Sequence, residues 1–392
     1  MPHLDYNGEK SERDAMKRWI WQQEGYPHFK YDLRKLEALL EKVAQEQGYL
    51  IAMSSVMSDE SVTQKQYEAL FHEAIATSAI EGEILNRDSV KSSIQKKLGM
   101  IEDDRSETEV DYLIEILLDA NTNYNGDLTL ERLFGWHYGL FPTGYSHFYK
   151  INVAMLRGEE TMQVVGGRPG NETVYYEAPP REILEEEMER FLQWFNETPA
   201  SLLKAAIAHL WFVIIHPFED GNGRITRTVT DLVLSKIENA HISRLYSMSN
   251  AINKDKKNYY KALERTTGYL EKDDAMDITY WCEWFLKTLL AALLDAKKKL
   301  HYVIEKTKFW DRHQEDNLNA RQVKVLNKIL DMGVENFEGD LSKKKYIKIA
   351  GTTPATASRD IAELLRLGCI EQVEGMDGRN VRYRVVLDIL NE

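Results

Sequence analysis

One segment of the chain is apolar on every side and is stable only inside a protein core. Residues 201–215 read SLLKAAIAHLWFVII, which is the length and composition of a buried helix. Pro217 cannot continue such a helix, so His216 is expected where the chain leaves the core. Residues 216–227, HPFEDGNGRITR, then place a histidine, two acids, a Gly-Asn-Gly turn and two arginines beside that segment. The core therefore ends at a loop that is rich in reactive groups.

Most of the chain before residue 300 has a helical pattern, with one interruption. Apolar residues recur at spacings of three and four over residues 19–53, where Asp32 is a suitable helix cap. Two short β-branched and aromatic runs, at 164–165 and 174–176, flank a turn of Gly, Pro and Asn. We therefore expect a helical body that carries one β-hairpin.

From about Asn317 the pattern changes to three helices and then two strands, which are joined by EGMDGRN at 374–380. This is the order of a winged helix-turn-helix, with Ser358 and Arg359 on the recognition helix. Residues 343–384 hold nine Lys and Arg against five Asp and Glu, a balance of +4 on an acidic chain. This excess predicts weak, salt-sensitive DNA binding, and a winged helix serves equally as a protein-docking module.

The length of 392 residues predicts more than one domain. The fold class that we expect is mainly α, with a β-hairpin and a small C-terminal winged-helix domain. We divide the chain into an N-terminal helical region (1–100), a helical core with the hairpin (101–300), a linker (301–316) and the winged helix (317–392).

Composition and charge exclude several classes of protein. Apolar residues make up 43% of the chain and charged residues 29%, as in soluble globular proteins. The net charge of −13 argues against wrapping of nucleic acid and against binding to an anionic membrane surface. The first ten residues do not resemble a secretion signal and no apolar run could span a bilayer, so we expect a cytoplasmic protein. Cys282 and Cys369 lack metal-ligand or CxxC spacing and indicate reduced, apolar side chains.

The loop at 216–227 contains groups that suit a bound phosphate. Gly221 and Gly223 allow backbone angles at which successive N–H groups converge on an anion, and the start of the next helix adds to that field. Arg224 and Arg227 are three residues apart and share a helix face, so both can reach the same polyphosphate. The sequence therefore predicts a nucleotide or phosphate site here.

Two further side chains suit chemistry at that phosphate. Asp220 would repel a phosphate unless it holds a Mg²⁺ that bridges the phosphate oxygens. His216, neutral near pH 7, can take a proton from an attacking hydroxyl, which is typically worth about 10² to 10⁴ in rate.

The string HPFEDGNGRITR resembles the signature of the Fic family (filamentation induced by cyclic AMP) and matches it at every fixed position. The resemblance implies a helical bundle with a β-hairpin flap, and transfer of AMP from ATP, with Mg²⁺, to a hydroxyl of a target protein. It also implies roles by position: His216 as base, Asp220 as Mg²⁺ ligand, Gly221, Asn222 and Gly223 as anion hole, and Arg224 and Arg227 as the grip on the outer phosphates.

The resemblance covers roughly residues 70–300 and implies partners as well. Residues 163–176 would be the flap, which in this family positions the target's backbone by strand addition. A homodimer is also implied. The N-terminal helix and the winged-helix tail resemble those of longer bacterial Fic proteins.

Residues 77–82, TSAIEG, resemble the autoinhibitory helix of Fic proteins, with Thr77, Glu81 and Gly82 at its fixed positions. Glu81 could pair bidentately with Arg227 and occupy the place that the γ-phosphate needs. A preference of only roughly 3 kcal/mol would keep about 99% of molecules closed. Some family members with this glutamate also remove AMP from their targets, and the sequence leaves both directions open.

The segment NYYKALERTT from Asn258 resembles the family's nucleoside-side helix and places Tyr260 near the adenine. Thr267 stands where some relatives have an asparagine, so the base contacts depart from the family pattern.

Three functions fit the sequence. The first is an AMP-transferring enzyme that is inhibited by Glu81. The second is a DNA-binding regulator whose Fic body senses a nucleotide and whose winged helix carries the output. The third is a nucleotide or phosphate hydrolase that uses His216 and a metal. The intact motif favours transfer over hydrolysis. A hydrolase usually gathers several metal ligands, and Asp220 is the single candidate metal ligand that the motif offers.

Overall fold

The computed structural model describes residues 19–55, 57, 59–101, 106–168, 171–238, 245–268, 276–334, 337–376 and 381–387. The chain divides into two compact units, Met1–Leu294 and Asp295–Glu392. The tip of the expected flap at 169–170 and part of the expected wing turn, at 377–380, lie outside the described residues.

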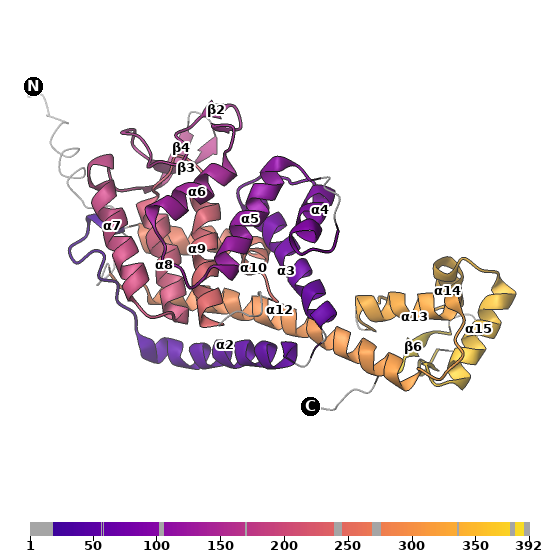
Figure 1. The fold of residues 1–392 in the computed structure, drawn as a ribbon. Helices are drawn as coiled ribbons and strands as arrows, with labels where there is room; N and C mark the ends of the chain where they lie inside the picture. The colour runs from indigo at the N-terminus through magenta and orange to yellow at the C-terminus, as the bar shows by residue number, and fades with distance from the viewer. Residues whose placement is uncertain are drawn as a thin grey trace, which may run out of the picture. The chain divides into compact units, whose positions relative to one another are not determined.

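The first unit is a helical body with two small hairpins (Figure 1). In chain order it contains η1 (Ile20–Gln22), α2 (Leu33–Ser54), α3 (Asp59–Ile80), α4 (Arg87–Lys97), α5 (Thr108–Thr122), α6 (Leu130–Leu140), β1 (Tyr145–Ser146), β2 (Tyr149–Lys150), β3 (Gln163–Arg168), β4 (Asn171–Glu177), α7 (Arg181–Glu197), α8 (Leu202–Ile215), α9 (Asn222–Ile237), α10 (Met248–Lys254), α11 (Lys256–Thr267) and the first part of α12 (Thr279–Arg312).

The apolar segment at 201–215 forms α8 and lies in the core, as predicted. Ser201 caps the helix by accepting a hydrogen bond from the backbone N–H of Lys204. Phe212 and Ile215 are fully buried, and α8 packs closely against α9. The loop between these two helices is therefore held by the most buried part of the unit.

The N-terminal helix begins at its predicted cap, Asp32. Residues 20–22 form one 3₁₀ turn, and α2 begins only after Asp32, whose carboxylate accepts a hydrogen bond from the backbone N–H of Arg34. The backbone N–H of Asp32 in turn donates to Thr279 Oγ1 at 2.8 Å, at the start of α12. Asp32 is thus the predicted cap, and it also joins the beginnings of two helices.

The helix that carries the TSAIEG stretch is part of the same unit as the rest of the helical body. α3 packs against α4, α5, α9 and α10. Residues 1–100 and the core at 101–294 therefore belong to one compact unit.

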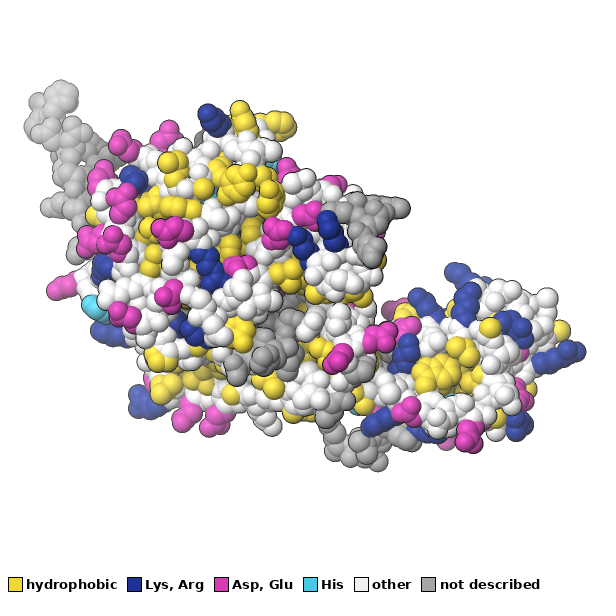
Figure 2. All heavy atoms as spheres, in the orientation of Figure 1, with side chains coloured by type: hydrophobic (Ala, Val, Ile, Leu, Met, Phe, Trp, Pro, Cys, Tyr) yellow, Lys and Arg dark blue, Asp and Glu magenta, His cyan; other side chains and the backbone are white. Residues whose placement is uncertain are grey.

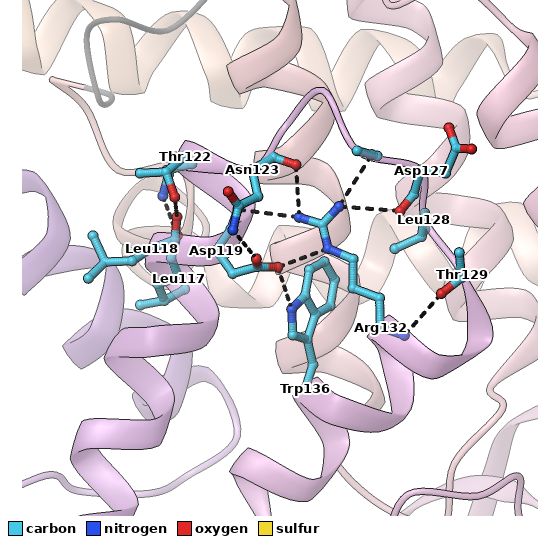
Figure 3. A network of polar contacts seen from close by, with 12 residues as sticks. Leu117, Leu118, Asp119, Thr122, Asn123, Asp127, Leu128, Thr129, Arg132 and Trp136 are labelled. Atoms are coloured by element: carbon cyan, nitrogen blue, oxygen red, sulfur yellow. Dashed lines mark hydrogen bonds and ion pairs between the residues drawn. The ribbon is translucent and has the colours of Figure 1, made fainter.

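A polar network fixes the turn between α5 and α6 (Figure 3). The Asp119 carboxylate accepts hydrogen bonds from Arg132 Nε at 2.8 Å and from Trp136 Nε1 at 2.9 Å. Arg132 Nη2 also donates to the backbone oxygens of Asp119 and Asn123. One carboxylate and one guanidinium thus join the end of α5 to α6, the helix that supports the loop at 216–221.

We expect Asp119→Ala to lower the free energy of unfolding by about 2 kcal/mol, because it leaves Nε of Arg132 and the indole N–H of Trp136 partly buried without their acceptor. Chemical denaturation of the full chain measures this. Asp127→Ala is the matched control, since Asp127 is exposed and contributes its backbone oxygen to the network. Equal stability of the two variants would contradict the structural role of Asp119.

The hairpin expected at 163–176 is present as β3 and β4, which pair antiparallel with a register shift between Val164 and Val165. A second hairpin, β1 with β2, was not predicted because each strand has only two residues. Phe148 at its turn is 94% exposed, and Val165 on β3 is 53% exposed. Figure 2 shows apolar side chains gathered at the end of the unit that carries these hairpins.

The second unit has the helix and strand order that the sequence predicted. It contains the remainder of α12, then α13 (Ala320–Met332), α14 (Lys343–Ala350), α15 (Pro354–Arg366), β5 (Ile370–Gln372) and β6 (Tyr383–Val385), with β5 and β6 antiparallel. Residues 301–312, assigned to a linker in the sequence analysis, are helical and belong to α12. Ser358 and Arg359 are exposed in the first turns of α15. On the face seen in Figure 2, Lys and Arg side chains are spread over this unit.

Within the described residues, no helix combines the length and apolar composition that crossing a lipid bilayer requires.

Candidate active site

The site is built where α8 ends and α9 begins. His216 follows α8 in the left-handed region, with φ 50° and ψ 60°, and Gly221 precedes α9 with φ 79°. A side chain at residue 221 would collide with the ring of Phe141. Asn222 Oδ1 accepts from the backbone N–H of Phe218 at 2.9 Å, and its Nδ2 donates to the Phe218 carbonyl at 2.7 Å. The Asn222 side chain therefore holds the loop in shape, and its backbone N–H is what remains for an anion.

The beginning of α9 is where the sequence predicts an anion-binding surface. The first N–H groups of a helix have no acceptor within it, and they carry partial positive charge. A side chain at Gly223 would collide with the carboxylate of Glu81. That carboxylate therefore lies directly over the start of α9, where a phosphate would bind.

The imidazole of His216 is arranged to accept a proton. Its Nδ1 lies 3.3 Å from the carbonyl oxygen of Val213, which only accepts hydrogen bonds, so Nδ1 carries the proton and the lone pair of Nε2 is free. The pKa of His216 is lowered to about 4, chiefly by loss of solvent around the ring and also by the nearby guanidinium of Arg157, whereas the hydrogen bond to Val213 and the charges of Glu81 and Asp220 act in the opposite direction. The ring is therefore neutral at pH 7.

Asp220 has the surroundings of a metal ligand. Its Oδ1 accepts from the backbone N–H of Gly221 at 2.6 Å, and its Oδ2 accepts from the hydroxyl of Ser146. In the part of the chain that the structure describes, no Lys or Arg forms an ion pair with it. A carboxylate with only neutral partners keeps its charge for a cation, and Mg²⁺ commonly takes one or two carboxylates together with substrate phosphates. The residues therefore fit a Mg²⁺ ion that is shared with a nucleotide.

Arg227 is bound by the end of α3. Its Nε donates to Thr77 Oγ1 at 2.8 Å, and its Nη2 donates to the Thr77 carbonyl at 2.9 Å and to Glu81 Oε1 at 2.8 Å. The pairing of Glu81 with Arg227 is thus present, but through one nitrogen rather than two, because Thr77 takes Nε.

Gly82 allows the chain to turn back at this point. Its φ is 88°, and the backbone N–H groups of Gly82 and Glu83 bond to the carbonyls of Ala79 and Ser78. These two bonds are the Schellman pattern, which ends a helix with a glycine in the left-handed region. The turn carries both Glu81 and Glu83 toward α9.

Glu83 forms an ion pair with the other arginine of the motif, Arg224. Its Oε2 lies 2.7 Å from Arg224 Nη1, and the Arg224 guanidinium also stacks 5.0 Å from the centre of the Phe141 ring. Sequence reasoning missed Glu83, although the spacing E-G-E was a usable signal: the two acids flank the glycine that turns the chain. Both arginines expected to bind outer phosphates are therefore paired with acids from one turn.

Tyr260 contacts the end of α3. Its hydroxyl donates to the Ile80 carbonyl at 3.3 Å, and 42% of the residue is exposed. Its neighbour Tyr259 is buried, with its hydroxyl 3.1 Å from His209 Nε2. Of the tyrosine pair, Tyr260 is the one that a nucleoside could reach, and Tyr259 is a core residue.

A cavity of about 650 Å³ opens on the other side of Arg224. Its lining includes Ser78, Glu83, Phe141 and Ser146, so it adjoins both the turn after α3 and the partner of Asp220. It provides room beside the motif for part of a substrate.

The comparisons with known proteins agree with this geometry. Residues 127–234, which include α6, the flap, α8 and most of α9, match the model of the Fic/DOC family. This part of the chain is a Fic/DOC domain. Residues 19–100 match a domain of unknown function, DUF4172, so α2, α3 and α4 belong to a recurring module that precedes the Fic/DOC region.

The fold resembles a Fic family protein from Desulfovibrio desulfuricans G20, with a TM-score of 0.50 and 18% identity over 89% of this chain and 96% of that one. At that identity the likeness concerns the fold. The likeness includes parts of both units, because the matched region is 89% of this chain.

Two curated relatives match shorter parts. A uridine 5'-monophosphate transferase from Xanthomonas campestris pv. campestris (strain 8004) is 26% identical over 125 residues, which are 27% of this chain and 23% of that protein. Protein adenylyltransferase fic-1 from Caenorhabditis elegans is 36% identical over 59 residues, 14% of this chain and 12% of that protein. The matched parts thus span less than a quarter of either relative.

Proposed function

We propose that this Fic/DOC protein transfers AMP from ATP to a Ser, Thr or Tyr hydroxyl of a target protein or of itself, and that Glu81 inhibits the transfer. One observation carries the proposal. The Glu81 carboxylate lies over Gly223 at the start of α9 and accepts a hydrogen bond from Arg227, and its charge acts on the ring of His216. A carboxylate bound there stands in for a phosphate.

In the proposed reaction, the hydroxyl oxygen of the target forms a bond to the α-phosphorus of ATP, and the bond from that phosphorus to the bridging oxygen of the β-phosphate breaks. Pyrophosphate leaves, and the hydroxyl proton passes to Nε2 of His216. The N–H groups at the start of α9 stabilise charge on the phosphoryl oxygens, and Arg224 and Arg227 orient the leaving pyrophosphate. Asp220 would hold Mg²⁺, which supplies neutralisation of the phosphate charge when it is bound.

One curated relative is a UMP transferase and the other an adenylyltransferase, so the two do not decide between the nucleotides. The choice of AMP rests on the resemblance in the motif. Removal of AMP by the same site is the alternative direction. Transfer predicts that Glu81→Gly, incubated with Mg²⁺ and ATP, retains label from the α-phosphate on protein and retains none from the γ-phosphate. Retention of γ-label would indicate phosphoryl transfer, and retention of neither in the presence of a lysate would contradict the proposal.

The flap is the proposed docking site of the target. The ends of β3 and β4 lie next to the site, because Tyr176 on β4 donates to the Ile214 carbonyl at 2.7 Å. Exposed apolar residues on β3, Val164 and Val165, suit contact with an extended segment of another protein. A homodimer stays a proposal that rests on the resemblance.

Glu83 is proposed to strengthen the inhibition by occupying Arg224. In a Glu81→Gly background, Glu83→Gln should lower the KM for ATP by about tenfold, because one charge-assisted hydrogen bond to a charged group is worth about 1.5 kcal/mol. Glu109→Gln is the matched control, since Glu109 is an exposed acid in the lining of the same cavity. Equal KM values for the two variants would show that Arg224 is not withheld by Glu83.

DNA binding by the winged helix is a second candidate function. Ser358 and Arg359 are exposed on α15, within a region of balance +4. We expect the full chain to be retained on duplex DNA at low salt and released as salt rises, with Arg359→Ala weakening retention. Binding that does not depend on salt or on Arg359 would favour a protein-docking role.

A further inference from the structure

A short strap, residues 152–158, is tied to the catalytic loop at several points. Asn152 donates from its backbone N–H and from Nδ2 to the carboxylate of Glu219, at 2.9 and 2.5 Å. The backbone N–H of Ala154 donates to His137 Nδ1 at 3.1 Å, and His137 Nε2 lies 3.2 Å from the carbonyl oxygen of Asp220. The strap and the loop are thus held together by side chains from both.

Arg157 is the residue of the strap that reaches the proposed base. Its backbone N–H donates to the Pro217 carbonyl at 2.9 Å, and its Nε donates to the His216 carbonyl at 2.9 Å. Its Nη2 donates to the carbonyl of Pro179, just after β4. One side chain therefore bonds to the proposed catalytic histidine and to the base of the flap.

The positive charge of Arg157 is not required for these bonds. The residue is 2% exposed, and among the described residues no acid forms an ion pair with it. Burial lowers the pKa of its guanidinium, which shows that the charge is held at a cost. A neutral donor could bond a carbonyl without that cost, so the charge is expected to have a separate role.

We infer that Arg157 is a positioning residue for the transfer reaction: its bonds to the carbonyls of His216, Pro217 and Pro179 fix the loop and the base of the flap as one unit and hold its charge near the imidazole. The inference rests on the proposed function of His216 as base. The charged groups near the ring are Arg157 from the strap, Glu81 from the turn after α3, and Asp220 from the loop itself. Arg157 is the cation among them, and it acts together with the desolvation of the ring against protonation.

The first test needs no activity. Histidines labelled with ¹³C at Cε1 are followed by NMR as pH falls, with His216→Ala used to assign the His216 resonance. In Arg157→Gln the His216 resonance should move toward its protonated position at a higher pH than in the wild type, because a nearby positive charge has been removed. Arg157→Lys retains the charge, so His216 in this variant should titrate as in the wild type. This variant can still be measured if Arg157→Gln folds poorly.

Arg181→Gln is the matched control, because Arg181 lies near Arg157 but pairs with Glu185 at 2.7 Å. An unchanged titration of His216 in folded Arg157→Gln would overturn the inference, whether or not the protein transfers AMP.

The second test separates position from charge. In a Glu81→Gly background, Arg157→Lys should lower kcat by about tenfold or more, because lysine cannot bond both carbonyls, while the KM for ATP changes little. A kcat equal to that of the Glu81→Gly parent would overturn the positioning role. Absence of activity in the parent would instead count against the proposed function and leave the NMR result to decide on Arg157.

Discussion

Replacing His216 by alanine in a Glu81→Gly chain should lower the rate of AMP transfer by about 10² to 10⁴-fold, the usual contribution of a general base. The side chain has one hydrogen bond to the protein, from Nδ1 to the Val213 carbonyl, and its Nε2 is left for the substrate. The loss should therefore appear in kcat, with little change in the KM for ATP. Initial rates of label transfer from α-labelled ATP measure both constants.

The same geometry predicts that His216→Ala unfolds at nearly the same denaturant concentration as its parent, because the backbone at residue 216 is held by Arg157. His28→Ala, at an exposed histidine, is the control for histidine loss. A His216→Ala protein that is folded and transfers AMP at the parental rate would remove the base from the proposed reaction.

Replacing Glu81 by glycine should raise the transfer rate by up to about 100-fold at ATP concentrations well below the KM, where a closed state favoured by roughly 3 kcal/mol excludes ATP most strongly. The change removes the carboxylate that covers Gly223 and frees Nη2 of Arg227. Thr77 still bonds Arg227, so the arginine keeps its position over the site. Labelling of protein with time in wild type and variant measures the effect.

Glu81→Gln is the informative comparison for this prediction. It preserves the length of the side chain and can still bond Arg227, but it lacks the charge that stands in for a phosphate. We expect it to fall between the wild type and Glu81→Gly. If both variants labelled no faster than the wild type, Glu81 would be a structural partner of Arg227 and not an inhibitor.

Local sequence patterns predicted the parts of the fold that depend on neighbouring residues. The apolar run before Pro217 predicted α8 and its end at His216. Asp32 was identified as a cap because capping depends on residues two or three positions away. Gly221 has the left-handed backbone that was predicted for the turn, whereas Gly223 lies in the first turn of α9. The order of helices and strands after Asn317 indicated the winged helix.

Contacts between distant segments had no comparable signal. Arg157 bonds the His216 carbonyl across 59 positions, and Glu83 pairs with Arg224 across 141. No periodic pattern links such residues, because the fold and not the local chain brings them together. The sequence analysis placed a linker at 301–316, whereas the structure continues α12 to Arg312.

The most direct measurement is a competition among nucleotides. Glu81→Gly would be incubated with Mg²⁺ and equal concentrations of ATP, GTP, CTP and UTP, alone and with a lysate, and the mass added to protein would be read by mass spectrometry. The account predicts the mass of AMP on a Ser, Thr or Tyr, and its absence when His216 is also alanine. The mass of UMP, or no added mass with any nucleotide, would contradict it.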